Sequence, residues 1–304
     1  MSVLAMDADE RALARASVRH VLESNPPSEV PGALLAEGWL ELVDADPASA
    51  ITVLGEEAGR TRSSAPVAAL AMLWGAGVTA DASTSVIVDD IVLAGVGAQR
   101  FVCVRDDGIT MVDADAVALS PINGFDSTLQ LSKTSVDDRR SETIADAATA
   151  ARAVAAGRRA LASEMVGAVE QMLTDTVDYV RERHQYGRAI GSFQSVKHRL
   201  ADVKVAATAA QAAVRTAWEI ADGPDEVTLA MAAKCLAGRA QRLASTHCFQ
   251  VHGGIAFTVE HGFQQWVRRG LLLDLLLGGH EQLTRELGHR LLEARAVPRL
   301  PDLR

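Results

Sequence analysis

The sequence predicts an α+β protein that is mostly α-helical, with a small β region between two helical regions. Two observations lead to this fold class. Apolar residues recur at helical spacing through most of residues 7–75, and again from Ser141 almost to the end. Between Ser85 and Val136, short β-branched runs punctuated by glycine and aspartate replace that spacing. We therefore expect an N-terminal helical domain, a small β domain, a C-terminal helical bundle and a tail, at residues 1–82, 83–140, 141–297 and 298–304.

The composition and charge exclude several classes of function. The chain has 304 residues, of which 48% are hydrophobic and 23% charged, as is ordinary for a globular protein. A net charge of −9 argues against a nucleic-acid-binding protein, which would present a basic face. No apolar run is long enough to cross a bilayer, so we expect no membrane association. Three widely spaced cysteines without a CxxC pair predict a cytoplasmic protein with neither disulfides nor a metal site.

The first helical region and the β region each divide into short segments. Helical spacing marks residues 9–22, 30–43 and 48–59, and Asn25-Pro26-Pro27 separates the first two. We interpret these segments as an amphipathic bundle without a site of its own. The β-favouring runs predict a mostly antiparallel sheet. They lie at residues 86–88, 91–93, 101–104, 109–112 and 129–132.

The C-terminal region contains long segments with helical spacing and short connections. Gly223-Pro224 ends the second of them, and Gly278-Gly279 breaks the chain before the last. Long helices joined by short connections are typical of an antiparallel four-helix bundle. The four predicted helices are residues 145–181, 192–221, 228–249 and 281–294.

A short polar segment joins the first two of these helices. It contains Arg183, Tyr186 and Gly187, and Phe193-Gln194 follow it. A guanidinium can form two parallel hydrogen bonds with a phosphate, and a glycine allows close approach of the backbone to a ligand. Taken alone, this segment is most simply an exposed arginine and a turn glycine.

A second segment that can bind an anion lies between Gln250 and Gly254, after another long segment with helical spacing. Gly253 and Gly254 expose backbone N–H groups that can bind an anion. We interpret His252 as a packing or hydrogen-bonding residue and not as a base.

The C-terminal part of the sequence resembles the C-terminal helical domain of the flavin-dependent acyl-CoA dehydrogenases. The matching features are, in order, a long helix, Arg-x-x-Tyr-Gly, two further helices and Gln-x-x-Gly-Gly. The resemblance covers about residues 147–292, and a weaker one at residues 37–75 implies a reduced N-terminal helical domain. It implies an FAD site shared between subunits. The residues implied in holding the pyrophosphate and adenosine of a neighbour's FAD are Arg183, Tyr186, Gly187, Phe193, Gln194, Gln250, Gly253 and Gly254.

The other half of the family's site is missing. Family members contact the flavin ring through a Trp-x-Thr-Asn or Trp-x-Thr-Ser segment of the β domain, where this chain has no tryptophan. They also need a carboxylate that removes the α-proton of the acyl group. The usual glutamate aligns with Gly278, and the alternative position of a minority lies at Gly157 and Arg158. His280 and Glu281 are weak candidates for a displaced base, and we predict no catalytic residue.

This division implies a non-catalytic partner subunit in an α2β2 heterotetramer, similar to the actinobacterial steroid-CoA dehydrogenases. A catalytic paralogue would contribute the glutamate and bind most of the acyl-CoA substrate, which we expect to be bulky and steroid-derived. This chain would hold the ADP portion of the partner's FAD. An electron-transfer flavoprotein is the expected electron acceptor.

Two other interpretations remain open from the sequence. The chain could form a homo-oligomer that performs different acyl-thioester chemistry, such as hydration or dehydration, with His280 or Glu281 as the acid–base group. It could also be a scaffold that has lost flavin, against which Arg183 argues. Flavin content with and without a paralogue distinguishes the three.

Overall fold

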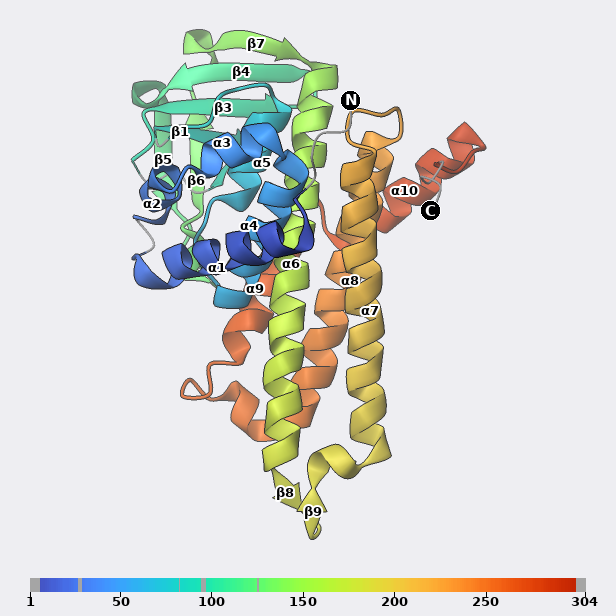
Figure 1. Ribbon diagram of the computed structural model, residues 1–304. Helices are drawn as coiled ribbons and strands as arrows, with labels where there is room; N and C mark the ends of the chain where they lie inside the picture. Colours follow the sequence, from blue (N-terminus) through green and yellow to red (C-terminus); the bar gives the residue numbers. More distant parts are fainter. Residues whose placement is uncertain (1–5, 27–28, 82, 94–96, 125, 299–304) are drawn as a thin grey trace.

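The computed structural model describes residues 6–26, 29–81, 83–93, 97–124 and 126–298. The predicted fold class is confirmed, because long helices dominate and a small sheet lies beside the N-terminal end of the longest one (Figure 1). Residues 299–304 of the predicted tail lie outside the described residues. Among the helices that the structure describes, none is long and apolar enough to cross a membrane.

The described helices that precede the sheet are short. α1 begins at a capping box, in which the Asp7 carboxylate accepts hydrogen bonds from the backbone N–H groups of Asp9 and Glu10. The helix predicted at residues 30–43 is two helices, because Gly38 adopts a φ of +74° between them. Their bounds are α1 (Ala8–Ser24), α2 (Val30–Ala36), α3 (Trp39–Ala45), α4 (Pro47–Thr61) and α5 (Val67–Gly75).

The described strands form a seven-stranded sheet in the order β5-β6-β2-β1-β3-β4-β7. Among the described strand pairs, only β1 and β3 are parallel neighbours. The prediction of a mostly antiparallel sheet is therefore confirmed. The strand predicted at residues 129–132 is wrong, because Gln130 has a φ of +50° and β6 starts at Ser132. The bounds are β1 (Thr84–Val88), β2 (Ile91–Leu93), β3 (Arg100–Arg105), β4 (Gly108–Asp113), β5 (Val117–Pro121), β6 (Ser132–Val136) and β7 (Glu142–Asp146).

The parallel pair places two acidic turns next to each other. Val88 at the end of β1 is in register with Val104 near the end of β3. The β1–β2 turn, Asp89-Asp90, therefore lies beside the β3–β4 turn that contains Asp106. Alternate residues of these strands face different cores, as the two-residue period of a strand requires. Val88 and Val104 face the core shared with the helices, and Ile87 and Cys103 face a smaller core.

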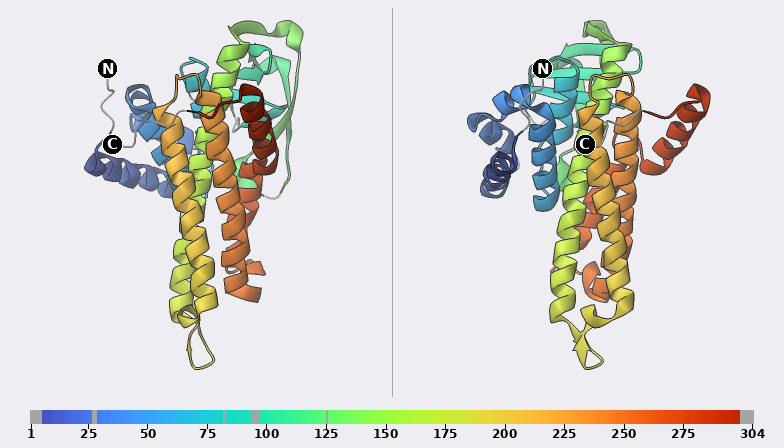
Figure 2. Two further views of the ribbon diagram at one scale, coloured as in Figure 1. Left: turned by 90° about the vertical axis from the view of Figure 1, so that its right-hand side faces the viewer. Right: turned by 45° about the vertical axis from the view of Figure 1, so that its right-hand side comes forward.

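Three long helices run side by side along the molecule (Figures 1 and 2). These are α6 (Ala147–Glu182), α7 (Gln194–Glu219) and α8 (Glu226–His252), and alanines fill much of their buried surfaces. α9 (Gln264–Leu275) packs against α6 and α8. α10 (His280–Ala294) packs on α8 through Leu283 and then points away from the other helices (Figure 2). The fourth helix of the bundle is thus attached at one end.

α4 crosses α6 at a contact made of small residues. A Cβ atom added to Gly59 of α4 would overlap the backbone oxygen of Glu164 on α6. One added to Gly167 of α6 would overlap the backbone oxygen of Glu56 on α4. Two helices approach this closely only where neither carries a side chain, so these glycines set the distance between α4 and the longest helix.

A buried arginine joins the three regions of the chain. Arg269 of α9 is fully buried, and its Nε and Nη2 donate hydrogen bonds to the Glu164 carboxylate at 3.0 and 2.6 Å. Nη1 donates to Thr128 Oγ1 at 3.0 Å, and Nη2 donates to the backbone oxygen of Ser63. The N-terminal helices, the segment before β6 and the C-terminal helices therefore meet at one guanidinium.

Candidate functional site

The first predicted cofactor segment is a β-hairpin at the end of the long helices (Figure 1). Its strands are β8 (His184–Gln185) and β9 (Arg188–Ala189), paired antiparallel. Between them Tyr186 has a φ of +51° and Gly187 a φ of +76°. Two consecutive residues with positive φ form the type I′ turn that suits a two-residue hairpin, and glycine adopts it without strain.

The side chains of this hairpin are exposed. Tyr186 is 93% exposed, and the ring of Phe193 meets its edge at a centroid distance of 6.2 Å. The guanidinium of Arg188 lies 4.2 Å from the centroid of the Phe193 ring. Arg183 is exposed and makes no ion pair or side-chain hydrogen bond to the part of the chain that the structure describes. Gln194, the first residue of α7, is exposed too.

The second predicted segment lies at the same end of the molecule. α8 ends at His252, and Gly253 follows with a φ of +66° and a ψ of −146°. Tyr179, one turn before Arg183 on α6, stacks on the His252 ring at a centroid distance of 4.4 Å. The fold therefore brings the two segments together. Gln250 and Gly254 are exposed beside this junction.

These residues fit the ADP portion of an FAD and not its ring. Exposed glycine backbone and a guanidinium without a protein partner are the donors that a pyrophosphate needs. A Cβ atom added to Gly187, Gly253 or Gly254 would meet nothing within 4 Å, so the backbone there is open to a ligand. The tryptophans that could cover a flavin ring lie on helices: Trp39 on α3, Trp74 on α5, Trp218 on α7 and Trp266 on α9.

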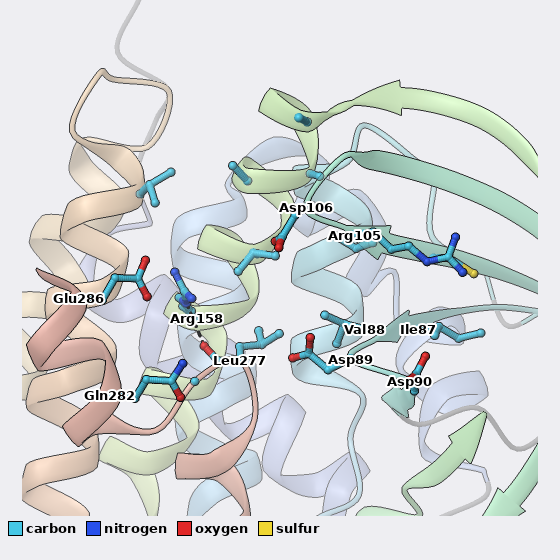
Figure 3. A pocket seen from close by; sticks show the side chains of 18 of the residues that line it. Ile87, Val88, Asp89, Asp90, Arg105, Asp106, Arg158, Leu277, Gln282 and Glu286 are labelled. Carbon is cyan, nitrogen blue, oxygen red and sulfur yellow. Dashed lines mark hydrogen bonds between the residues drawn. The ribbon is translucent and has the colours of Figure 1, made fainter. Parts of the chain in front are cut away.

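Both family positions for the catalytic base line one cleft of about 620 Å³ (Figure 3). Gly278 reaches it from the loop between α9 and α10, and Arg158 from α6. Figure 3 shows Arg158 between the α10 side chains Gln282 and Glu286 on one side and the Asp89 turn on the other. Neither base position carries a carboxylate, although other carboxylates line the walls.

A glutamate at Gly278 would need a strained backbone and a shift of the Leu283 side chain. Gly278 has a φ of +97°, and a Cβ atom there would lie 2.8 Å from Leu283 Cδ2. Leu277 also has a positive φ, +57°, and its carbonyl accepts a hydrogen bond of 3.0 Å from Arg158 Nε. Burial lowers the pKa of Arg158, and the charge of Glu286 opposes that shift. Arg158 thus stands at the alternative position of the catalytic base and supports the loop that contains the usual position, Gly278.

His280 and Glu281, the weak candidates for a displaced base, do not line the cleft at Gly278. His280 Nδ1 is 2.7 Å from Asp274 Oδ2, and both residues line a separate groove of about 340 Å³ between α8 and α9. Glu281 is exposed on α10 and is not one of the residues that line the cleft at Gly278.

Sequence reasoning missed the polar walls of the cleft. Gln282 and Glu286 are four residues apart on α10, a spacing that puts them on one helix face. Asp89 and Asp106 come together only through the parallel pairing of β1 and β3. The helical spacing was visible in the sequence, whereas the strand pairing was not.

Lys234 of α8 holds the loop between α9 and α10 from inside the protein. Its side chain is fully buried, and Nζ donates hydrogen bonds to the backbone oxygens of Asp274 and Gly278 at 2.8 and 3.3 Å. Burial lowers the pKa of Lys234 from 10.5 to about 8, against the attraction of Asp274.

Replacing Lys234 should change how stability depends on pH. A lysine whose pKa is lowered by folding adds stability above pH 10.5, and that contribution is lost as the pH falls to about 8. We therefore expect the free energy of unfolding of the wild type, relative to Lys234→Met, to rise by about 3 kcal/mol between these values. Urea unfolding of both proteins from pH 7.5 to 10.5 measures this difference, and a constant difference would contradict the buried amine.

Comparison with known proteins identifies the relatives of this chain. Residues 147–292 match the acyl-CoA dehydrogenase C-terminal domain family. Acyl-CoA dehydrogenase IpdE2 of Mycobacterium tuberculosis is 40% identical over 134 residues, which cover 44% of this chain and 41% of that protein. The IpdE2 of Mycolicibacterium smegmatis is 34% identical over 185 residues, 60% of this chain and 57% of that protein. The chain therefore spans about half the length of these curated relatives.

Solved structures share the fold over nearly the whole chain. The Tcur3481-Tcur3483 steroid acyl-CoA dehydrogenase has a TM-score of 0.81 at 21% identity, covering 95% of this chain and 99% of that chain. The ChsE4-ChsE5 complex from Mycobacterium tuberculosis has a TM-score of 0.78 at 16% identity, covering 98% and 100%. Residues 147–292 therefore form an acyl-CoA dehydrogenase C-terminal domain, and the whole chain shares the fold of the acyl-CoA dehydrogenases.

Proposed function

We propose that this chain is the non-catalytic partner subunit of an FAD-dependent acyl-CoA dehydrogenase. One observation carries the proposal: Gly278 and Arg158, the two family positions for the base, line the same cleft and neither is a carboxylate. Without a base at the α-carbon, the dehydrogenation step has no proton acceptor in this subunit. A catalytic paralogue would contribute it.

The exposed hairpin and the Gly253 turn would bind the ADP portion of the paralogue's FAD. FAD supplies the two-electron oxidation in this family. Arg183 would bind the pyrophosphate, because its guanidinium is exposed and its carbonyl and N–H already hold the hairpin in place. Gly253 and Gly254 would add backbone N–H groups, and Tyr186 with Phe193 an aromatic surface for the adenosine.

The names of two structures with this fold suggest the kind of assembly and substrate. Each is named for a pair of proteins, and one is called a steroid acyl-CoA dehydrogenase. We therefore propose an α2β2 heterotetramer that acts on a bulky, steroid-derived acyl-CoA bound mainly by the paralogue. The name of a third structure of this fold refers to an electron transferring flavoprotein. We propose a protein of that kind as the electron acceptor.

A homo-oligomer with hydration or dehydration chemistry is the alternative. The Asp274–His280 pair favours it, because a carboxylate that orients a histidine is a common acid–base arrangement. However, His280 lines the groove between α8 and α9 and not the cleft at Gly278. An acyl group placed as in the family would not reach it.

Flavin stoichiometry tests the proposal. The chain purified alone should be colourless, and co-purification with its paralogue should give about one FAD per heterodimer, measured by absorbance and mass. A yellow homo-oligomer with one FAD per chain would contradict the partner-subunit function. That result would favour the homo-oligomer with His280 as its acid–base group.

Replacing Arg183 should weaken FAD retention in the complex. Loss of a charge-assisted bond to the pyrophosphate should raise the FAD dissociation constant about 10- to 100-fold in Arg183→Ala, while the subunits stay associated. Arg181→Ala is the matched control, because Arg181 is exposed on the same helix end and pairs with Asp178. Equilibrium dialysis of FAD measures both variants, and equal affinities would contradict the role of Arg183.

A further inference from the structure

The ring of His252 is held in one defined tautomer. It is 4% exposed, and Nε2 lies 3.1 Å from Thr176 Oγ1 on α6. The single hydroxyl proton of Thr176 is donated to the backbone oxygen of Met172 at 2.6 Å. The hydroxyl must therefore accept, and His252 Nε2 must donate. The lone pair is on Nδ1, which is buried and has no hydrogen-bond partner in the part of the chain that the structure describes.

α6 contacts both the ring and the backbone of His252. Tyr179 stacks on the ring with an interplanar angle of 29°, and its hydroxyl donates to the backbone oxygen of His252 at 3.5 Å. His261 and Phe263 cover the ring from the loop before α9, at centroid distances of 4.7 and 4.6 Å. The last residue of α8 is thus enclosed on several sides.

The turn that follows depends on this enclosure. Gly253 adopts a φ of +66° and a ψ of −146°, a conformation that glycine tolerates but does not by itself prefer. Its N–H donates to the backbone oxygen of Phe249. A Cβ atom at Gly253 or Gly254 would meet nothing within 4 Å, so the space beside the glycines is open. The buried residues on either side of the glycines are His252 before them and Ala256 after them.

We propose that His252 is a positioning residue: its neutral ring, held by Thr176 and Tyr179, fixes the Gly253–Gly254 turn against α6, and protonation of Nδ1 releases the turn. Tyr179, which contacts His252, lies one helical turn before Arg183, so the proposal deepens the ADP-holding function and rests on it for its effect on FAD. The proposal also predicts that the turn opens more often as the pH falls.

The electrostatic surroundings support this sensitivity. Burial, and then the nearby His261, lower the pKa of His252 from 6.5 to about 4. Burial also raises the pKa of Asp175 and, to about 11, that of the Cys248 thiol. Tyr179 on α6 and His261 before α9 contact the ring. Cys248 on α8 lies beside Thr176, and Asp175 on α6 interacts electrostatically with His261 and with Arg62 after α4.

The expected pH dependence follows from these values. A histidine whose pKa is lowered by folding stabilises the closed turn fully above pH 6.5, and that contribution is lost as the pH falls toward 4. Between pH 7.5 and 5.0 the opening equilibrium of the turn should therefore rise about 30-fold. Hydrogen exchange of residues 250–257 in the full chain measures it, after correction for the intrinsic rate at each pH.

Three variants separate the parts of the proposal. His252→Gln should lose the pH step because the side chain no longer titrates. Thr176→Val should raise opening about 10-fold at both pH values, because it removes the acceptor of the Nε2 hydrogen bond. Thr176→Ser keeps a hydroxyl, so its opening should return to the wild-type level. A pH step that persists in His252→Gln, or unchanged exchange in Thr176→Val, would overturn the proposal.

FAD retention in the complex distinguishes this inference from the function on which it rests. If Thr176→Val increases both exchange and FAD release, the positioning role and the ADP site are both supported. If exchange increases and FAD release does not, His252 positions the turn but the turn does not hold FAD. That second result would contradict the proposed function and leave the positioning role intact.

Discussion

Arg269→Met should lower the free energy of unfolding by about 3–5 kcal/mol, the loss typical when one partner of a buried ion pair is removed. Arg269 is fully buried and donates two hydrogen bonds to Glu164, which would be left as a buried carboxylate without its counter-charge. The bonds to Thr128 and Ser63 would be lost as well. Urea unfolding at pH 7.5 measures the change. Arg268→Met is the matched control, because Arg268 is exposed, and it should differ from the wild type by less than about 0.5 kcal/mol.

Two further measurements separate lost charge from lost packing. Burial already raises the pKa of Glu164, and removing Arg269 should raise it further. A carboxyl whose pKa is raised by folding adds stability at low pH that is lost as the pH rises, so the defect should be smaller at pH 5 than at pH 8. Glu164→Leu combined with Arg269→Met should recover much of the loss. A double variant as unstable as the single one would show that the guanidinium acts by packing.

Gly167→Ala should cost about 3 kcal/mol, whereas Gly288→Ala should gain about 0.5–1 kcal/mol. Both glycines lie inside helices, so the substitution removes the same backbone freedom from the unfolded chain. The added methyl at Gly167 overlaps the backbone oxygen of Glu56 on α4, and the one at Gly288 meets nothing within 4 Å. Urea midpoints of the two variants should therefore shift in opposite directions. Shifts of the same sign would mean that α4 and α6 can move apart without cost.

The long helices were predictable because their signal is local. The helices expected at residues 145–181 and 228–249 are α6 (Ala147–Glu182) and α8 (Glu226–His252). A helix forms its hydrogen bonds within its own segment, so apolar spacing and breakers such as Gly223-Pro224 place its ends to within a few residues. Strands depend on their neighbours instead. β7 was missed because Glu142 to Asp146 form a strand only through pairing with β4.

By itself, the sequence determined the helical architecture, the two segments with Arg183 and Gly253, and the absence of a carboxylate at Gly278 and Arg158. Only the tertiary structure decided that these last two positions share one cleft, since Arg158 and its hydrogen-bond partner Leu277 are 119 residues apart. It alone also placed His280 in a different groove, although His280 is only two positions after Gly278 in the sequence. Such contacts arise when distant helices pack together, and no local pattern in the sequence encodes which faces meet.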